Sequence, residues 1–116
     1  MNTEKDPNGK SAHEPGSKLD AGKVRPDLIL SGMPRALMAI SRVATFGAQK
    51  YTENGWQDVP EGIKRYTAAM DRHRLKELME QADPDSGLMH QAHLAWNALA
   101  RLELMLREAE KWERAA

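Results

Sequence analysis

The chain has 116 residues, no cysteine, and 17 basic and 17 acidic residues that cancel. This length predicts a single domain, and the absence of cysteine excludes a disulfide framework and thiolate metal sites. Balanced charge gives no overall field that attracts nucleic acid or an anionic membrane, so an anion must be bound locally. No stretch has the apolar length of a signal peptide core or a membrane span, and we therefore expect a cytoplasmic protein.

The first part of the chain is predicted to lack regular structure. Residues 1–17 are rich in Gly, Pro, Ser, Asn and charge, which is typical of a disordered tail, so the folded domain is expected at residues 18–116. Residues 18–33 alternate charged and apolar side chains without a helical period, which indicates an irregular arm. Cations on this arm can clamp a phosphate chain beside an acidic site, although the residues alone favour a solvated arm. The residues concerned are Lys18, Lys23 and Arg25, with Asp20 between them.

Three helices are predicted after the arm, and no strand pattern competes with them. The first covers residues 34–50, because a proline is favoured at the first helical position and an apolar stripe with helical period follows. The second starts near residue 60, with Asp58 as its N-cap, and ends at the Pro- and Gly-containing turn of residues 83–87. The third covers about residues 86–114.

The third helix carries a continuous apolar face opposite a polar one. Three helices provide a thin core, so a second copy is expected to cover the surplus apolar surface in a homodimer or higher homo-oligomer. The predicted fold class is all-α: a small helical bundle of about three main helices with an irregular N-terminal arm, completed by oligomerisation. The apolar face comprises Leu88, Ala92, Ala95, Leu99, Leu102 and Leu106.

Polar side chains stand on the second and third helices where core residues are expected. Their spacings keep each set on one helical face, and antiparallel packing of the two helices would bring the sets together. Because unpaired burial of such groups is costly, a cluster of this kind indicates a metal or catalytic site. The sets are His73, Glu77 and Glu80 on the second helix, and His90, His93 and Asn97 on the third.

The acidic members of this cluster are candidate metal ligands. Glu77 and Glu80 are three residues apart, so both can reach one cation, and Asp83 follows in the turn. Carboxylate oxygens suit Mg²⁺ or Mn²⁺. The alternative is an ordinary exposed helix end with surface charge. A zinc site at His90 and His93 lacks a third strong ligand at a familiar spacing.

The loop after the first helix carries candidate ligand-binding side chains. Trp56, or Tyr51, can stack on a nucleobase, and Lys50 and Arg72 add cations for an anionic ligand. Trp56 can equally cap the hydrophobic core, and most arginines on a helix are surface residues. Both interpretations stay open at this point.

Four segments together resemble a known family. The chain reads KLDAGKVRPDLIL, ATFGAQKYTENGW, RYTAAMDRH and DPDSGLMHQAHLAWNALARLEL in this order. This combination resembles the dATP/dGTP diphosphohydrolase family found in tailed bacteriophages, which is related to the MazG-like all-α nucleoside triphosphate pyrophosphohydrolases. The resemblance covers roughly residues 18–104, and its specificity comes from the order of the segments, since no single segment is specific.

The resemblance implies hydrolysis of a purine deoxynucleoside triphosphate to the monophosphate and pyrophosphate, with Mg²⁺ or Mn²⁺ as cofactor. Metal-held carboxylates would activate a water, and cations would stabilise the leaving pyrophosphate. The candidate catalytic residues are Glu80, His93 and His73, and the candidate metal ligands are Glu77, Glu80 and Asp83. The candidate substrate-binding residues are Lys18, Asp20, Lys23, Arg25, Lys50, Tyr51, Trp56, Arg72 and Asn97.

Two other functions compete with the enzyme. The Glu-Glu-x-x-Glu motif of MazG-like enzymes is absent, which favours a non-catalytic nucleotide-binding protein, such as a phage sponge that sequesters a signalling nucleotide. A purely structural helical adaptor would bind no nucleotide, and it leaves the polar cluster without an explanation. The residues therefore favour the enzyme, then the binder, then the adaptor.

Overall fold

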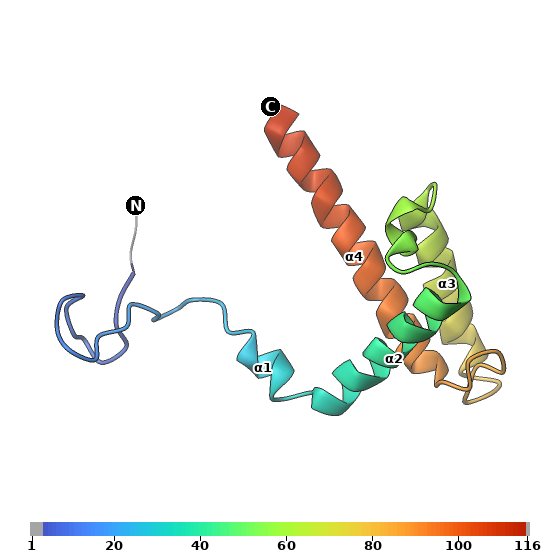
Figure 1. Cartoon of the computed structure of the whole chain (residues 1–116), viewed down its shortest axis with the longest axis horizontal. Coiled ribbons are helices and arrows are strands. Elements are labelled where there is room, and N and C mark those ends of the chain that lie inside the picture. Colours follow the sequence, from blue (N-terminus) through green and yellow to red (C-terminus); the bar gives the residue numbers. More distant parts are fainter. Residues whose placement is uncertain (1–3, 116) are drawn as a thin grey trace. The chain divides into compact units, whose positions relative to one another are not determined.

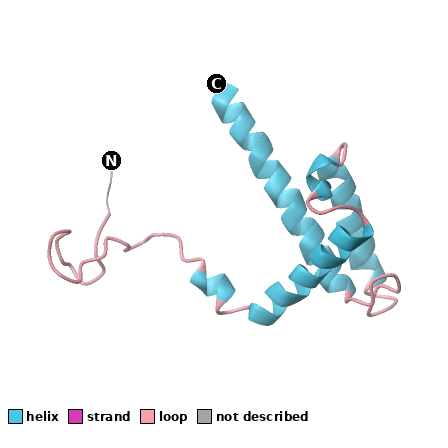
Figure 2. Cartoon of the chain, in the orientation of Figure 1, coloured by secondary structure: helices cyan, strands magenta, loops and turns pink. Residues whose placement is uncertain are grey.

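The computed structural model describes residues 4–115, and within this range the regular secondary structure is helical (Figure 1, Figure 2). The predicted all-α class is therefore confirmed. The chain divides into two compact units, Met1–Met33 and Pro34–Ala116. Between residues 4 and 115, no helix is long and apolar enough to span a lipid bilayer.

The first unit contains turns and one short helix, α1, Asp27–Leu30. Its turns are organised by Asp6, whose carboxylate accepts backbone N–H groups from Asn8 at 2.9 Å, Lys10 at 3.1 Å and Lys18 at 2.9 Å. These N–H groups, with that of Lys18 contributing most, hold the pKa of Asp6 below its usual value. One side chain thus closes the loop that precedes the basic arm.

The disorder predicted for residues 1–17 stays a prediction, as does the domain boundary after it. Residues 1–3 of that tail lie outside the described residues, whereas residues 4–17 form the turns around Asp6.

The second unit contains the three main helices that the sequence predicts. They are α2, Pro34–Lys50, α3, Gly62–Lys76, and α4, His90–Ala115, and a 3₁₀ helix, η1, Gly55–Asp58, lies between α2 and α3. Helix α4 contacts both α2 and α3, and η1 contacts α3 (Figure 1). The predicted extents of the first helix and of the C-terminal end of the last helix are confirmed.

The start of α3 differs from the prediction. Asp58 was expected to cap this helix, but it is the last residue of η1, and α3 begins only at Gly62. Glu61 precedes the helix in the left-handed conformation, with φ at 55°. A Cβ added to Gly62 would lie 2.8 Å from Leu104 Cδ1, so glycine permits the close approach of α3 and α4 here.

The connection between α3 and α4 is longer than predicted. Helix α3 ends at Lys76 and α4 begins at His90, later than the predicted residue 86. In a helix, backbone carbonyls would accept the N–H groups of these residues, but here side chains of the turn accept them. The Asp83 carboxylate accepts the Ser86 N–H at 2.9 Å, and Ser86 Oγ accepts the Leu88 N–H at 3.1 Å. These local bonds hold the turn and delay the helix start.

The buried residues of the second unit are of two kinds. The buried apolar residues are Val43, Tyr66, Ala92 and Ala100, and the buried polar residues of α4 are His90, His93 and Asn97. Conversely, the C-terminal part of the apolar face of α4 is open, since Leu99, Leu102 and Leu106 are 49%, 50% and 54% exposed. Helix α4 therefore turns its polar face inward within the second unit.

Candidate functional site

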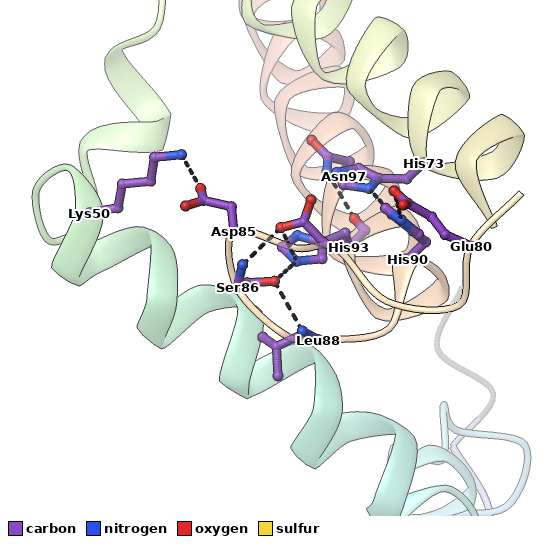
Figure 3. A network of polar contacts seen from close by, with 10 residues as sticks. Lys50, His73, Glu80, Asp85, Ser86, Leu88, His90, His93 and Asn97 are labelled. Carbon is purple, nitrogen blue, oxygen red and sulfur yellow. Dashed lines mark hydrogen bonds and ion pairs between the residues drawn. The ribbon is translucent and has the colours of Figure 1, made fainter.

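Three histidines meet where the end of α3 lies beside the first turns of α4 (Figure 3). The rings of His73 and His93 stack with 4.6 Å between their centroids and 11° between their planes. The Nδ1 atoms of His73 and His90 lie 2.9 Å apart, within hydrogen-bond distance. His90 is completely buried. The spacing argument from the sequence thus leads to side chains that the structure brings into contact.

A carboxylate is bound to the buried end of this cluster. Glu80, which follows α3, accepts a hydrogen bond from His90, with 3.1 Å between Glu80 Oε1 and His90 Nε2. The Glu80 side chain is 46% exposed, so it connects the buried imidazole with solvent. Glu80 is one of the predicted catalytic residues, whereas His90 was predicted as a member of the cluster and considered only for a zinc site.

The second histidine of α4 has a different set of partners. His93 Nε2 lies 2.6 Å from Ser86 Oγ and 3.9 Å from the Asp83 carboxylate, and the ring of Phe46 meets the imidazole edge to face at 6.3 Å. Ser86 was not among the residues predicted for the cluster. Its position seven residues before His93, just outside the helix, is the signal that marks it as a partner of that histidine.

The charges of this cluster follow from its burial. Burial, followed by repulsion from His93 and His90, lowers the pKa of His73 to about 4. Burial also lowers the pKa of His93, against the opposing effect of Asp83. Burial alone raises the pKa of Asp83, but hydrogen bonds from Ser86 bring it below its usual value. At neutral pH the site therefore combines neutral imidazoles at His73 and His93 with an ionised Asp83.

The three predicted metal ligands have separate partners. Glu77 binds Arg74 at 2.9 Å, Glu80 binds His90, and Asp83 binds the Ser86 backbone. Within residues 4–115, no group of three or more acidic, histidine or cysteine side chains is arranged to hold a metal ion. In this arrangement the carboxylates do not fit Mg²⁺ or Mn²⁺, and the metal centre stays a prediction.

Glu77 and Glu80 do share a surface hollow of about 380 Å³. Leu78, Met79 and Met89 also line it, and these three side chains are strongly exposed. The larger groove of the second unit, about 740 Å³, lies elsewhere, between η1, the start of α3 and α4. None of the three clustered histidines lines that groove, so its size does not mark it as the site of the histidine chemistry.

Lys50 lies at the end of α2 and pairs with the turn beside the cluster. Its Nζ contacts the Asp85 carboxylate at 2.5 Å, and it lies 5.7 Å from the ring centroid of Phe46 and 5.4 Å from that of Tyr51. The hydrogen bond that Lys50 donates to Asp85 is the main reason that the pKa of Lys50 is raised. Lys50 and Tyr51 are both exposed, and their binding to substrate stays a prediction.

Trp56 belongs to a separate aromatic cluster. Its ring packs edge to face against Tyr66 at 6.4 Å and Trp96 at 6.0 Å, and the Tyr66 hydroxyl donates to the Trp56 carbonyl at 2.6 Å. The Arg107 guanidinium lies 5.6 Å from the Trp56 ring centroid. Trp56 thus covers part of the core, and contact with a nucleobase stays a prediction.

The remaining candidates are not joined to the histidines by side-chain bonds. Asn97 is buried, and its amide donates to the His93 carbonyl of its own helix at 2.8 Å, while Arg72 is exposed on α3. The basic arm lies in the first unit, where Lys23 pairs with Glu4 at 2.8 Å and Arg25 with Asp27 at 2.9 Å. Substrate binding by these residues, and by Lys18 and Asp20, stays a prediction.

Comparison with known proteins identifies the family of this chain. A search of curated proteins and a search of solved structures found no match. A sequence model described as "dATP/dGTP diphosphohydrolase, N-terminal" matches residues 13–114, which include parts of both units and every residue of the histidine cluster. Since the match covers most of the chain, this protein belongs to the dATP/dGTP diphosphohydrolase family.

Proposed function

We propose that this protein hydrolyses a purine deoxynucleoside triphosphate, dATP or dGTP, to the monophosphate and pyrophosphate in phage nucleotide metabolism. The observation that carries the proposal is the family match over residues 13–114. The histidine cluster supports it, because neutral imidazoles beside ionised carboxylates are the groups that activate water as general bases. The proposed location of the protein is the cytoplasm, which contains deoxynucleoside triphosphates.

His73 is the proposed general base. Its low pKa keeps the imidazole neutral at physiological pH, and its stacking on His93 fixes the plane of the ring. The reaction places new charge on the pyrophosphate oxygens, which nearby cations stabilise. Lys50 contacts Asp85 in the turn beside the cluster and acts electrostatically on His93, and we assign it to the triphosphate.

The requirement for Mg²⁺ or Mn²⁺ is carried over from the family resemblance. When bound, such an ion would neutralise phosphate charge. Glu77, Glu80 and Asp83 have separate partners, so their arrangement does not itself indicate a metal ion. Turnover with and without a chelator therefore tests the metal dependence directly.

A homodimer or higher homo-oligomer is also part of the proposal. Leu99, Leu102 and Leu106 form a half-exposed apolar stripe on α4, with Met105 beside them. Contiguous exposed apolar surface of this kind marks an interaction site on a small domain. A second copy would cover it with an equivalent stripe, as two-fold symmetry requires.

The decisive experiment measures turnover of a panel of deoxy- and ribonucleoside triphosphates, reading released pyrophosphate and monophosphate. We expect turnover of dATP or dGTP, loss of turnover with chelator, and a fall of at least about 100-fold in kcat for His73→Gln. Glu103→Gln is the matched control, since Glu103 is exposed on α4 and pairs only with Arg107 of the same helix at 2.8 Å. Absence of turnover from the folded protein with every nucleotide would overturn the proposal.

One observation favours a second candidate, a nucleotide-binding protein without catalysis. The acidic side chains are already paired, and no metal-holding group is formed among the described residues. A binder of this kind would retain a nucleotide unchanged in the presence of chelator. Equilibrium dialysis with labelled dATP and dGTP, followed by analysis of the recovered nucleotide, separates it from the enzyme.

A further inference from the structure

Glu80, His90 and His73 form a continuous chain of hydrogen bonds from solvent to the proposed base. Glu80 Oε1 lies 3.1 Å from His90 Nε2, and His90 Nδ1 lies 2.9 Å from His73 Nδ1. His90 is completely buried, so both of its ring nitrogens are used within the protein. Figure 3 shows the three side chains in sequence along this chain.

The direction of these hydrogen bonds follows from the carboxylate at one end. An ionised carboxylate only accepts, so His90 Nε2 must carry the proton that it donates to Glu80. In a neutral imidazole the other nitrogen then has no proton, and His90 Nδ1 must accept. His73 Nδ1 is therefore the donor of the second bond, which leaves the lone pair of His73 on Nε2.

The Nε2 atom of His73 is the atom that this chain leaves open. No hydrogen bond to it exists in the part of the chain that the structure describes. Among the described residues, Ser17 Oγ is the one buried side-chain nitrogen or oxygen without a hydrogen-bond partner. His73 Nε2 has no partner and is not in that class, so it is accessible to solvent. A solvent-accessible lone pair on a neutral imidazole is what a general base requires.

We propose that His90 is a positioning residue that connects the Glu80 carboxylate to His73 and fixes the tautomer with the lone pair on Nε2. This role rests on the proposed function, in which His73 is the base. His73 Nε2 takes one proton from the attacking water, and the water oxygen forms a bond to the α-phosphorus. The bond from that phosphorus to the bridging oxygen breaks, and pyrophosphate leaves with its electron pair.

The chain also compensates the charge that this step creates. Protonation at Nε2 makes His73 a cation, whose Nδ1–H still points at His90. The ionised Glu80 at the far end of the two hydrogen bonds stabilises that cation, in the way that a carboxylate orients and stabilises a catalytic imidazole elsewhere. Glu80 thus acts on the reaction through His90, without contact with the substrate.

The proposal is tested by the tautomers of the histidines, read from long-range ¹H–¹⁵N NMR spectra of the ¹⁵N-labelled full chain at one neutral pH. The chain contains four histidines, and single His→Gln variants assign them. We expect a proton on Nδ1 of His73 and on Nε2 of His90. In Glu80→Ala and in His90→Phe we expect His73 to lose this single tautomer, while Glu103→Gln preserves it.

A conservative variant separates positioning from packing. In His90→Asn, the amide oxygen takes the place of Nδ1 as acceptor, so we expect His73 to keep its tautomer while the connection to Glu80 is lost. Turnover should fall at least about 100-fold in kcat in His90→Phe, with KM little changed, and recover in part in His90→Asn. If His90→Phe does not fold, the His73 tautomer in the wild-type protein and in Glu80→Ala still tests the proposal.

The outcomes distinguish this proposal from the proposed function. A wild-type His73 with its proton on Nε2, or an unchanged tautomer in Glu80→Ala, would overturn the role of His90. Expected tautomers in a protein that turns over no nucleotide would support the hydrogen-bond chain and overturn the proposed function instead.

Discussion

The two faces of α4 differ in a way that reverses the usual pattern of an amphipathic helix. The face that contacts α3 carries His90, His93 and Asn97, all buried, whereas the opposite face carries the half-exposed Leu99, Leu102 and Leu106. A surface helix normally directs its apolar stripe to the core. This difference supports the proposed catalytic site on the inner face of α4 and the proposed homo-oligomer contact on its outer face.

The largest expected effect comes from the apolar part of the inner face. Tyr66 is buried, packs against Trp56 and Trp96, and donates to the Trp56 carbonyl. We expect Tyr66→Ala to lower the free energy of unfolding by about 3–5 kcal/mol, because it removes a buried ring and leaves a carbonyl without its partner. Urea unfolding measures this value. A loss comparable to that of Met38→Ala, an exposed residue of α2, would contradict this account of the core.

The outer face of α4 is expected to contribute to self-association of the protein. Burial of one leucine side chain contributes about 1.5–3 kcal/mol, which corresponds to roughly a ten- to hundredfold change in a dissociation constant. We therefore expect Leu102→Asp to weaken the homo-oligomer by at least that factor, as measured by sedimentation velocity over a range of concentrations. Lys64→Ala, at an exposed position of α3, is the control, because it lowers the net charge by the same single unit. A wild-type protein that stays monomeric at all concentrations would contradict the assignment of this face.

The lowered pKa of His73 gives the inner face a pH-dependent contribution to stability. The pKa of His73 is about 4 in the folded protein, against an ordinary value of 6.5. Below pH 6.5 the unfolded chain therefore binds a proton that the folded protein does not, and the free energy of unfolding falls as the pH drops to 4. One pKa unit corresponds to about 1.4 kcal/mol, and partial exposure of the ring reduces the effect, so we expect a loss on the order of 1–2 kcal/mol.

This prediction has a matched pair of variants. His73→Gln should flatten the fall in stability between neutral and mildly acidic pH, whereas Leu102→Ala should leave the slope unchanged. Urea unfolding at several pH values measures both slopes. Equal slopes in wild type and His73→Gln would show that another group carries the acid sensitivity.

The contrast between the faces also explains how much of the fold the sequence could predict. The bounds of α2 and the C-terminal end of α4 follow from prolines and helical periodicity, which act locally. The start of α4 does not, because Asp83 and Ser86 satisfy backbone groups of the turn with their own side chains. Periodicity likewise cannot show that Asp58 closes a 3₁₀ helix instead of capping α3.

The sequence predicted which residues form the candidate site better than it predicted the hydrogen bonds between them. Spacing alone places His73, His90 and His93 on facing helices, and the structure brings them into contact. Glu80 was expected on the second helix, but it follows the end of α3 and contacts His90 from the turn. The hydrogen-bond partners within the cluster depend on side-chain rotamers and on the crossing angle of α3 and α4. Neither can be derived from the spacing of residues in the sequence. The role of Ser86 was missed for this reason.

The smallest expected effect concerns Ser86 at the edge of the inner face. Its hydroxyl contacts His93 Nε2 at 2.6 Å and accepts the Leu88 N–H, so removal leaves two partly buried groups without a partner. We expect Ser86→Ala to cost about 1–2 kcal/mol in unfolding free energy, and Ser86→Thr to restore most of it, because threonine keeps the hydroxyl. Urea unfolding compares the two variants, with Ser41→Ala as the control, since Ser41 is exposed and its hydroxyl bonds only the Leu37 carbonyl of its own helix. Equal stability of Ser86→Ala and wild type would mean that water replaces the hydroxyl, and that His93 is held in place by its stack on His73 rather than by the turn.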